Sequence, residues 1–208
     1  WRTPWNQTVV VPGRFTVHQN ERGVFIYPQG DMDVPPSGHM AQESWFFDAL
    51  IRQPEIDEAQ LNPRDNLEEF RDVTDIELAY YRQACSQAHK SGKGIVITTG
   101  WTSLGDISQV PGPGLAYPKG IRDITEWYIA TVERQDYIHE VFSQQTETAL
   151  RNLEKLHAAV GNIPDAIYVC GTDFGTQVSQ FCSKETFVSL YAPYYHKIND
   201  WIHEHTTW

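Results

Sequence analysis

The amino-acid sequence predicts an α/β fold built around a parallel sheet or barrel. Two short apolar strands, at residues 95–99 and 166–170, each lead into a loop and then into a stretch with helical periodicity. Helices that alternate with strands in this way are typical of βα units, whose strands run parallel. Because no internal repeat or flexible linker interrupts this order, we expect residues 1–208 to form a single domain.

Residues 1–50 predict a β-hairpin or meander ahead of the βα units. Short β-rich stretches, the first at 8–11, alternate with turn residues up to position 27. The segment 30–38 contains two prolines and two glycines, which leave no continuous hydrogen-bond ladder, so a loop is expected there. It leads towards an aromatic cluster at 45–47.

The first helix is expected between Val73 and His89, where apolar residues recur at helical spacing. The glycine-containing segment 91–94 follows it, as is typical of a helix C-terminal cap. The strand at 95–99 is β-branched and apolar on both faces, a pattern that predicts a parallel strand covered by helices. A long loop over 100–120 comes next.

A second helical region covers 121–132 and 137–156 and ends at Gly161. The strand at 166–170 then runs into a polar loop, 171–177. The order of these elements repeats the helix–strand–loop pattern of the preceding unit.

The last helix is expected to begin after Ser183, which has the side chain of an N-cap and is followed by Glu185 in the first turn. Pro193 lies inside the continuing pattern. It should kink the helix or start a new one as its first residue.

The composition excludes several classes of partner. Sixteen Lys and Arg against 27 Asp and Glu give a net charge of −11, which argues against nucleic acid because phosphate binding begins with a basic surface. The longest apolar runs are far shorter than the roughly 20 residues that span a bilayer, so no membrane partner is expected. Three cysteines in no CxxC spacing favour reduced thiols and a cytoplasmic protein.

Candidate site residues follow the two strands, because loops at the carboxyl ends of parallel strands form the active sites of such folds. After the second strand come Thr172, Asp173 and Gln177, and the loop after the first contains Trp101 and Asp106. Asp173 could act as an acid or base or hold a substrate; alternatively it caps a turn between two glycines. Trp101 and Asp106 could line a pocket, or they could be a packed aromatic and an exposed carboxylate.

Local spacing does not predict a metal site. His203 and His205 are two residues apart on a helical pattern and cannot face one ion, unlike the i, i+4 pair of HExxH. The cysteines have no histidine at ligand spacing, and no phosphate-binding glycine motif follows either strand directly.

The segment Asp165–Gln177 (DAIYVCGTDFGTQ), with 183–187 and 192–198, resembles the uroporphyrinogen decarboxylase superfamily. The superfamily includes the zinc-dependent, corrinoid-linked methyltransferases, such as methylcobalamin:coenzyme M methyltransferases and the methyltransferase subunits of O-demethylases. The strand at 94–99 resembles the preceding barrel strand of the family. Residues 1–50 resemble the family only in having a β-hairpin and a Gly-Asp loop. The resemblance therefore covers about the C-terminal half of the chain.

The resemblance implies a TIM (β/α)8 barrel, which needs about 250 residues, so this chain is expected to be an internal portion of one. Residues 1–50 would be an inserted hairpin and loop region, and 73–208 would be βα units. The implied function is methyl transfer between a small substrate and a corrinoid carried by a partner protein, assisted by zinc whose His-x-Cys ligands are expected beyond Trp208. Asp173 would be catalytic, and Trp101, Asp106, Thr172 and Gln177 would bind substrate.

Two alternatives remain open. A uroporphyrinogen decarboxylase would need arginines and a positioning Asp and Tyr around a deep cleft. Gln109 stands near the place of that tyrosine, and Gly171-Thr172-Asp173 departs from the Ser-His pattern of the decarboxylases. The other alternative is a non-catalytic, barrel-derived binding protein.

Overall fold

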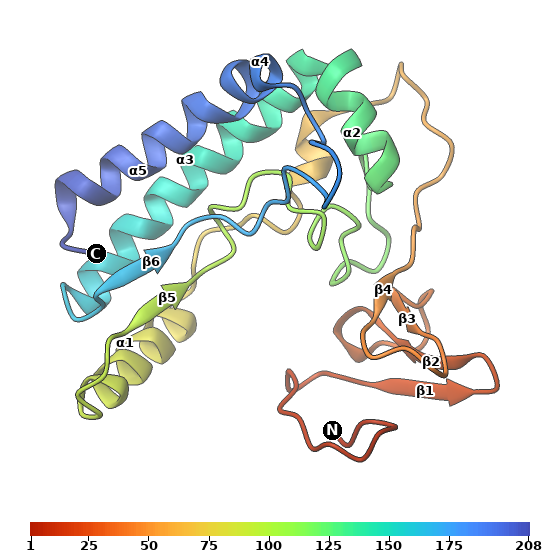
Figure 1. Ribbon diagram of the computed structural model, residues 1–208, viewed down its shortest axis with the longest axis horizontal. Helices are drawn as coiled ribbons and strands as arrows, with labels where there is room; N and C mark the ends of the chain where they lie inside the picture. The colour runs from red at the N-terminus through yellow and green to blue at the C-terminus, as the bar shows by residue number, and fades with distance from the viewer.

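The computed structural model describes residues 1–208 as a mixed α/β structure, which confirms the predicted fold class at that level. A small antiparallel sheet forms the N-terminal part, and helices packed on a parallel strand pair form the rest (Figure 1). No closed barrel is formed. None of the helices is both long enough and apolar enough to cross a bilayer.

The N-terminal sheet is a four-stranded meander rather than a single hairpin. Its strands pair in sequence order and are β1 (Val17–Asn20), β2 (Gly23–Ile26), β3 (Gly38–Met40) and β4 (Asp48–Ala49). The expected strand at 8–11 is wrong: this stretch makes only an isolated bridge, between Thr8 and Arg2. Gly23, at the β1–β2 turn, has a φ of 127°, and a Cβ there would lie 2.1 Å from the carbonyl oxygen of Met40.

From residue 73 onwards the remaining elements follow the predicted order, whereas the 3-10 helices Pro28–Gly30 and Pro63–Leu67 were not predicted. The elements after the N-terminal sheet are the 3-10 helix Pro63–Leu67, α1 (Asp75–His89), β5 (Val96–Thr98), α2 (Ile124–Glu133), α3 (Gln135–Val160), β6 (Ala166–Tyr168), α4 (Lys184–Thr186), a π-helical turn (Phe187–Tyr191) and α5 (Ala192–His205).

The helix starts follow from capping side chains. Thr74 and Glu77 form a reciprocal capping box at the start of α1. The predicted cap at Ser183 is confirmed, since its Oγ accepts from the amide of Thr186 at 3.0 Å. Helix α5 begins at Ala192, so Pro193 lies in its first turn and is not its first residue as expected; the π-helical turn before it joins α4 to α5.

Strands β5 and β6 pair in parallel, with Ile97 opposite Ile167. Ile97 packs against Cys85 of α1 and Leu156 of α3, so one face of the pair is covered by helices. The opposite face carries Val96 and Tyr168, which are 65% and 55% exposed. The expectation that helices cover both faces of the first strand is therefore wrong, because no element packs on the Val96 side.

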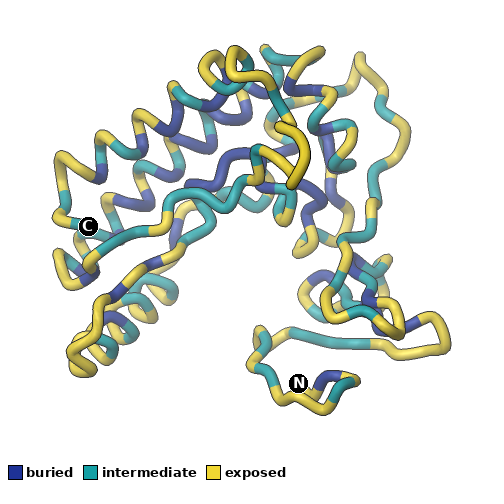
Figure 2. The backbone as a smooth tube through the Cα atoms, viewed as in Figure 1, coloured by how far each residue is buried: buried dark blue, intermediate teal, exposed yellow.

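The main core lies where α3 meets α2, α5 and the loop after β5. Leu104, Ile121, Ile138, Phe142 and Leu190 are completely buried there. Figure 2 shows buried positions along the facing sides of α3 and α5 and within the loop, whereas half of residues 1–50 are exposed. The long loop is thus part of the core, which fixes the residues at the carboxyl end of β5.

Candidate functional site

The loops that follow β5 and β6 are joined by hydrogen bonds. Thr172 Oγ1 donates to the carbonyl of Leu104 at 2.8 Å, and the amide of Gly171 donates to Ser103 Oγ at 3.1 Å. Thr102 Oγ1 donates to the carbonyl of Val169. Because both strands are parallel, their carboxyl ends lie at one edge of the pair, and these bonds combine the two loops into one surface.

Tyr195 of α5 supports this surface through hydrogen bonds to both loops. Its hydroxyl accepts from the amide of Leu104 at 3.2 Å and bonds Thr172 Oγ1 at 3.1 Å and Cys170 Sγ at 3.0 Å. Burial raises the pKa of Tyr195 above its ordinary value, so the phenol stays protonated. Thr172, which is predicted to bind substrate, uses its hydroxyl to connect the loops.

Asp106 is buried under the same surface, with 8% of its area exposed. Its Oδ1 accepts from the amide of Ser108 at 2.8 Å and from Ser108 Oγ at 2.7 Å. The other oxygen, Oδ2, lies against Gly171, where a Cβ would be only 2.7 Å away. Asp106 is therefore brought close to the loop that follows β6, and glycine at 171 makes the approach possible.

Asp173 is exposed, and its carboxylate accepts no hydrogen bond from its own turn. Its backbone carbonyl accepts a long bond, 3.5 Å, from the hydroxyl of Tyr128. Burial first, and the neighbouring charge of Asp173 second, raise the pKa of Tyr128 to about 12. The turn-capping interpretation requires a bonded carboxylate, and the carboxylate of Asp173 is instead open to solvent. Gln177 is also exposed, further along the same loop.

A cavity of about 480 Å³ opens at the carboxyl end of β5. Its lining comes from four parts of the chain: Gln29; Glu68, Glu69, Phe70, Arg71 and Glu77; Thr99, Gly100 and Trp101; and Gln109, Gly112, Pro113, Gly114 and Leu115. Trp101 therefore does line a pocket, as predicted. Its ring packs edge-on against Tyr81, with the centroids 6.1 Å apart, which fixes its orientation.

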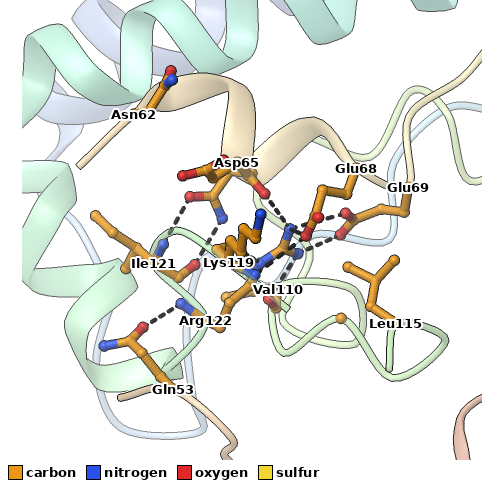
Figure 3. Close-up of polar contacts among 12 residues, drawn as sticks. Gln53, Asn62, Asp65, Glu68, Glu69, Val110, Leu115, Lys119, Ile121 and Arg122 are labelled. Atoms are coloured by element: carbon orange, nitrogen blue, oxygen red, sulfur yellow. Dashed lines mark hydrogen bonds and ion pairs between the residues drawn. The ribbon is translucent and has the colours of Figure 1, made fainter. Parts of the chain in front are cut away.

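The wall of this cavity is built on Arg122, whose side chain is 1% exposed (Figure 3). The guanidinium donates to Glu69 through two nitrogens, at 2.7 and 3.1 Å, and to the carbonyls of Lys119 and Asp65, each at 2.6 Å. Glu68 lies at 3.6 Å from Nη2. A buried guanidinium with all these acceptors holds the Glu68–Glu69 segment rigidly.

The segment that leads from the N-terminal sheet is attached to the same loop. Arg52 donates to the carbonyls of Leu115 and Gly112, each at 2.6 Å. Gln53 Oε1 accepts from the amide of Asp123 at 2.8 Å and from that of Arg122. These bonds position Gln29 and the rest of the meander beside the cavity.

Metal ligands do not gather in this chain. No three His, Cys, Asp or Glu side chains come together in a geometry that could hold a metal ion. Cys85, Cys170 and Cys182 form no disulfide, and His203 and His205 lie exposed on α5. The residues of this chain therefore offer no zinc site; the ligands that the resemblance implies are expected beyond Trp208.

Sequence reasoning missed the acidic segment and its partner. Glu68 and Glu69 have the local pattern of a solvated surface, and only the fold brings them to Arg122, more than fifty residues away. Tyr195 was missed for the same reason. A weak signal existed in Arg122, a charged residue between apolar Ile121 and the N-cap Asp123.

No family model, curated protein or solved structure matches the chain. The resemblance carried by residues 165–177 therefore enters only as a proposal. In the structure this segment contains β6, and its last part, up to Gln177, follows the carboxyl end of that strand.

Proposed function

We propose that this chain is part of a uroporphyrinogen decarboxylase-like enzyme that moves a methyl group between a small substrate and a corrinoid. A partner protein carries the corrinoid, which supplies or takes up the methyl group. The resemblance of residues 165–177 motivates the choice of superfamily. The role proposed for the residues of this chain is to bind and orient the substrate at the carboxyl ends of β5 and β6, and it does not depend on the implied zinc.

The proposal includes a (β/α)8 barrel in which β5 and β6 are neighbouring strands. Three features support it: the parallel pairing, the connection through α2 and α3, and helices on one face only. In a barrel, the exposed face with Val96 and Tyr168 would point inwards, where side chains of other strands fill the interior. An apolar groove beside Tyr80, Cys85 and Val96 is suited to a further strand at the free edge of β5.

The observation that carries the proposal is the unbonded carboxylate of Asp173, in the loop that follows β6. A carboxylate at this position, on a loop held by Thr172 and Gly171, can orient a substrate or accept and return a proton. Tyr128 lies beside it with a raised pKa, so its phenol remains neutral and can donate a hydrogen bond. The pair thus offers one acceptor and one donor on a rigid support.

The cavity at the end of β5 is lined by Trp101 and not by Asp173, and its charges argue against the decarboxylase alternative. A substrate with many carboxylates needs free arginines around its site. The single arginine that lines the cavity is Arg71, and both its terminal nitrogens are bonded to Glu77 at 2.9 Å. Three carboxylates line the same cavity, and these would repel such a substrate.

Two assays on the protein expressed from its natural gene test the proposal. We expect it to demethylate methylcobalamin in the presence of a thiol acceptor, followed by the change in the corrinoid spectrum. Loss of carboxyl groups from uroporphyrinogen III, without corrinoid demethylation, would overturn the proposal in favour of a decarboxylase. If the enzyme demethylates methylcobalamin, its rate with a panel of thiols identifies the acceptor class.

A further inference from the structure

The cavity at the end of β5 is lined by more negative than positive side chains, and its positive side chain is already paired. Glu68, Glu69 and Glu77 line it, against Arg71 as the single cationic side chain of the lining. Arg71 is bonded to Glu77 through two nitrogens and is not free for an anionic ligand. The available charge in the cavity is therefore negative.

Glu68 is the carboxylate with unused capacity. Glu69 is bound by two nitrogens of Arg122, whereas Glu68 lies 3.6 Å from that guanidinium and accepts only from the amide of Lys119 at 3.2 Å. Its side chain is one-third exposed. The ion pair with Arg122 and the bond from Lys119 both use Oε2 of Glu68, so a ligand cation could approach Oε1 without breaking either contact.

Aromatic and neutral polar groups complete the cavity. Trp101 is held by its contact with Tyr81 and adds an aromatic ring to the lining, together with Phe70. The hydroxyl of Thr99 is buried and has no hydrogen-bond partner. Aromatic rings next to a carboxylate attract organic cations, because the ring face is negative and the carboxylate supplies the counter-charge.

We propose that this cavity binds a small organic cation, an ammonium or quaternary ammonium head group, with Glu68 as the charge partner and Trp101 as the aromatic wall. The volume of about 480 Å³ suits a small molecule. Binding of the cation rests on the cavity alone; that the cation is the methyl donor or acceptor rests on the proposed function.

The test is calorimetric titration of the protein with choline, with methylammonium, and with 3,3-dimethylbutan-1-ol, which has the shape of choline without its charge. At least one of the two cations should bind at least about tenfold more tightly than the neutral alcohol. Glu68→Gln and Trp101→Leu should each weaken the binding of that cation by about tenfold.

Matched controls are Glu154→Gln on the exposed side of α3 and Trp45→Leu in the N-terminal part, both of which should leave binding unchanged. The inference is overturned if neither cation binds, if the neutral alcohol binds equally well, or if Glu68→Gln has no more effect than Glu154→Gln. Cation binding without corrinoid demethylation would overturn the proposed function and leave the inference standing. Corrinoid demethylation without cation binding would overturn the inference and leave the proposed function standing.

Discussion

Arg122 donates to both carboxylate oxygens of Glu69, at 2.7 and 3.1 Å, from a side chain that is almost completely buried. This ion pair links the acidic segment after the 3-10 helix to the loop that precedes α2. It is thus part of the framework of the cavity and not of its exposed surface. Removing the ion pair should lower the free energy of unfolding more than it weakens ligand binding.

Arg122→Met should lower the free energy of unfolding by about 3–5 kcal/mol, because it leaves Glu69 without its partner and removes the donors to the carbonyls of Lys119 and Asp65. Denaturant unfolding followed by circular dichroism measures this. Arg122→Lys should recover only part of the loss, since an ammonium cannot bond both oxygens in the same planar geometry. Equal stability of the wild-type protein and Arg122→Met would show that the ion pair contributes nothing.

Gly171→Ala should destabilise the protein by about 1–3 kcal/mol, because the new methyl group would lie 2.7 Å from Asp106 Oδ2. Asp106 is held by Ser108 and cannot turn away freely. In a double-mutant cycle, Asp106→Ala should abolish most of the penalty of Gly171→Ala. Additive effects of the two substitutions would contradict the close approach of the two strand ends.

Tyr195→Phe should cost about 1–3 kcal/mol, because the buried amide of Leu104 loses its acceptor and the loops after β5 and β6 lose their shared support. Hydrogen exchange at Leu104 should become faster by a larger factor than at the centre of α3. Tyr80→Phe, at an exposed position on α1, is the control and should change neither quantity.

The pH dependence of α1 follows from its capping box. The hydrogen bonds from Arg71 hold the pKa of Glu77 at about 2, against an ordinary value of 4.5. A carboxyl whose folded pKa is lowered stabilises the fold above its unfolded pKa, and this contribution disappears as the pH falls through the folded value. Helix α1 should therefore lose stability between about pH 5 and pH 2, by about 1 kcal/mol for an exposed cap.

The measurement is unfolding at a series of pH values for the wild-type protein and Glu77→Gln. The difference between their stabilities should be largest above pH 5 and should shrink towards pH 2. A difference that stays constant with pH would mean that the charge of Glu77 is not responsible.

Local patterns in the sequence were sufficient to locate the helices and strands of the βα part. They were insufficient to predict which faces of those elements are covered. Periodicity located α1 and α3, and the capping residue Ser183 located the start of α4, because these signals act within one turn of helix. The exposure of Val96 could not be predicted, since a β-branched strand has the same sequence whether one face or both are covered.

The candidate site was predictable in part. Asp173, Asp106 and Trp101 could be placed because each follows a recognisable strand. The wall formed by Glu68, Glu69 and Arg122 was not predictable, since the segments meet only through tertiary packing. The difference between Thr172, which connects loops, and Asp173, whose carboxylate is free, also depends on side-chain contacts that sequence position does not determine.

The most direct test of the proposed active site is the kcat/KM for corrinoid demethylation by Asp173→Ala, measured together with its unfolding midpoint. The exposed Asp200 of α5, replaced by alanine, is the matched control. We expect Asp173→Ala to lower kcat/KM by at least about tenfold with an unchanged unfolding midpoint, while Asp200→Ala retains full activity. Full activity of Asp173→Ala would contradict an active site at the carboxyl end of β6.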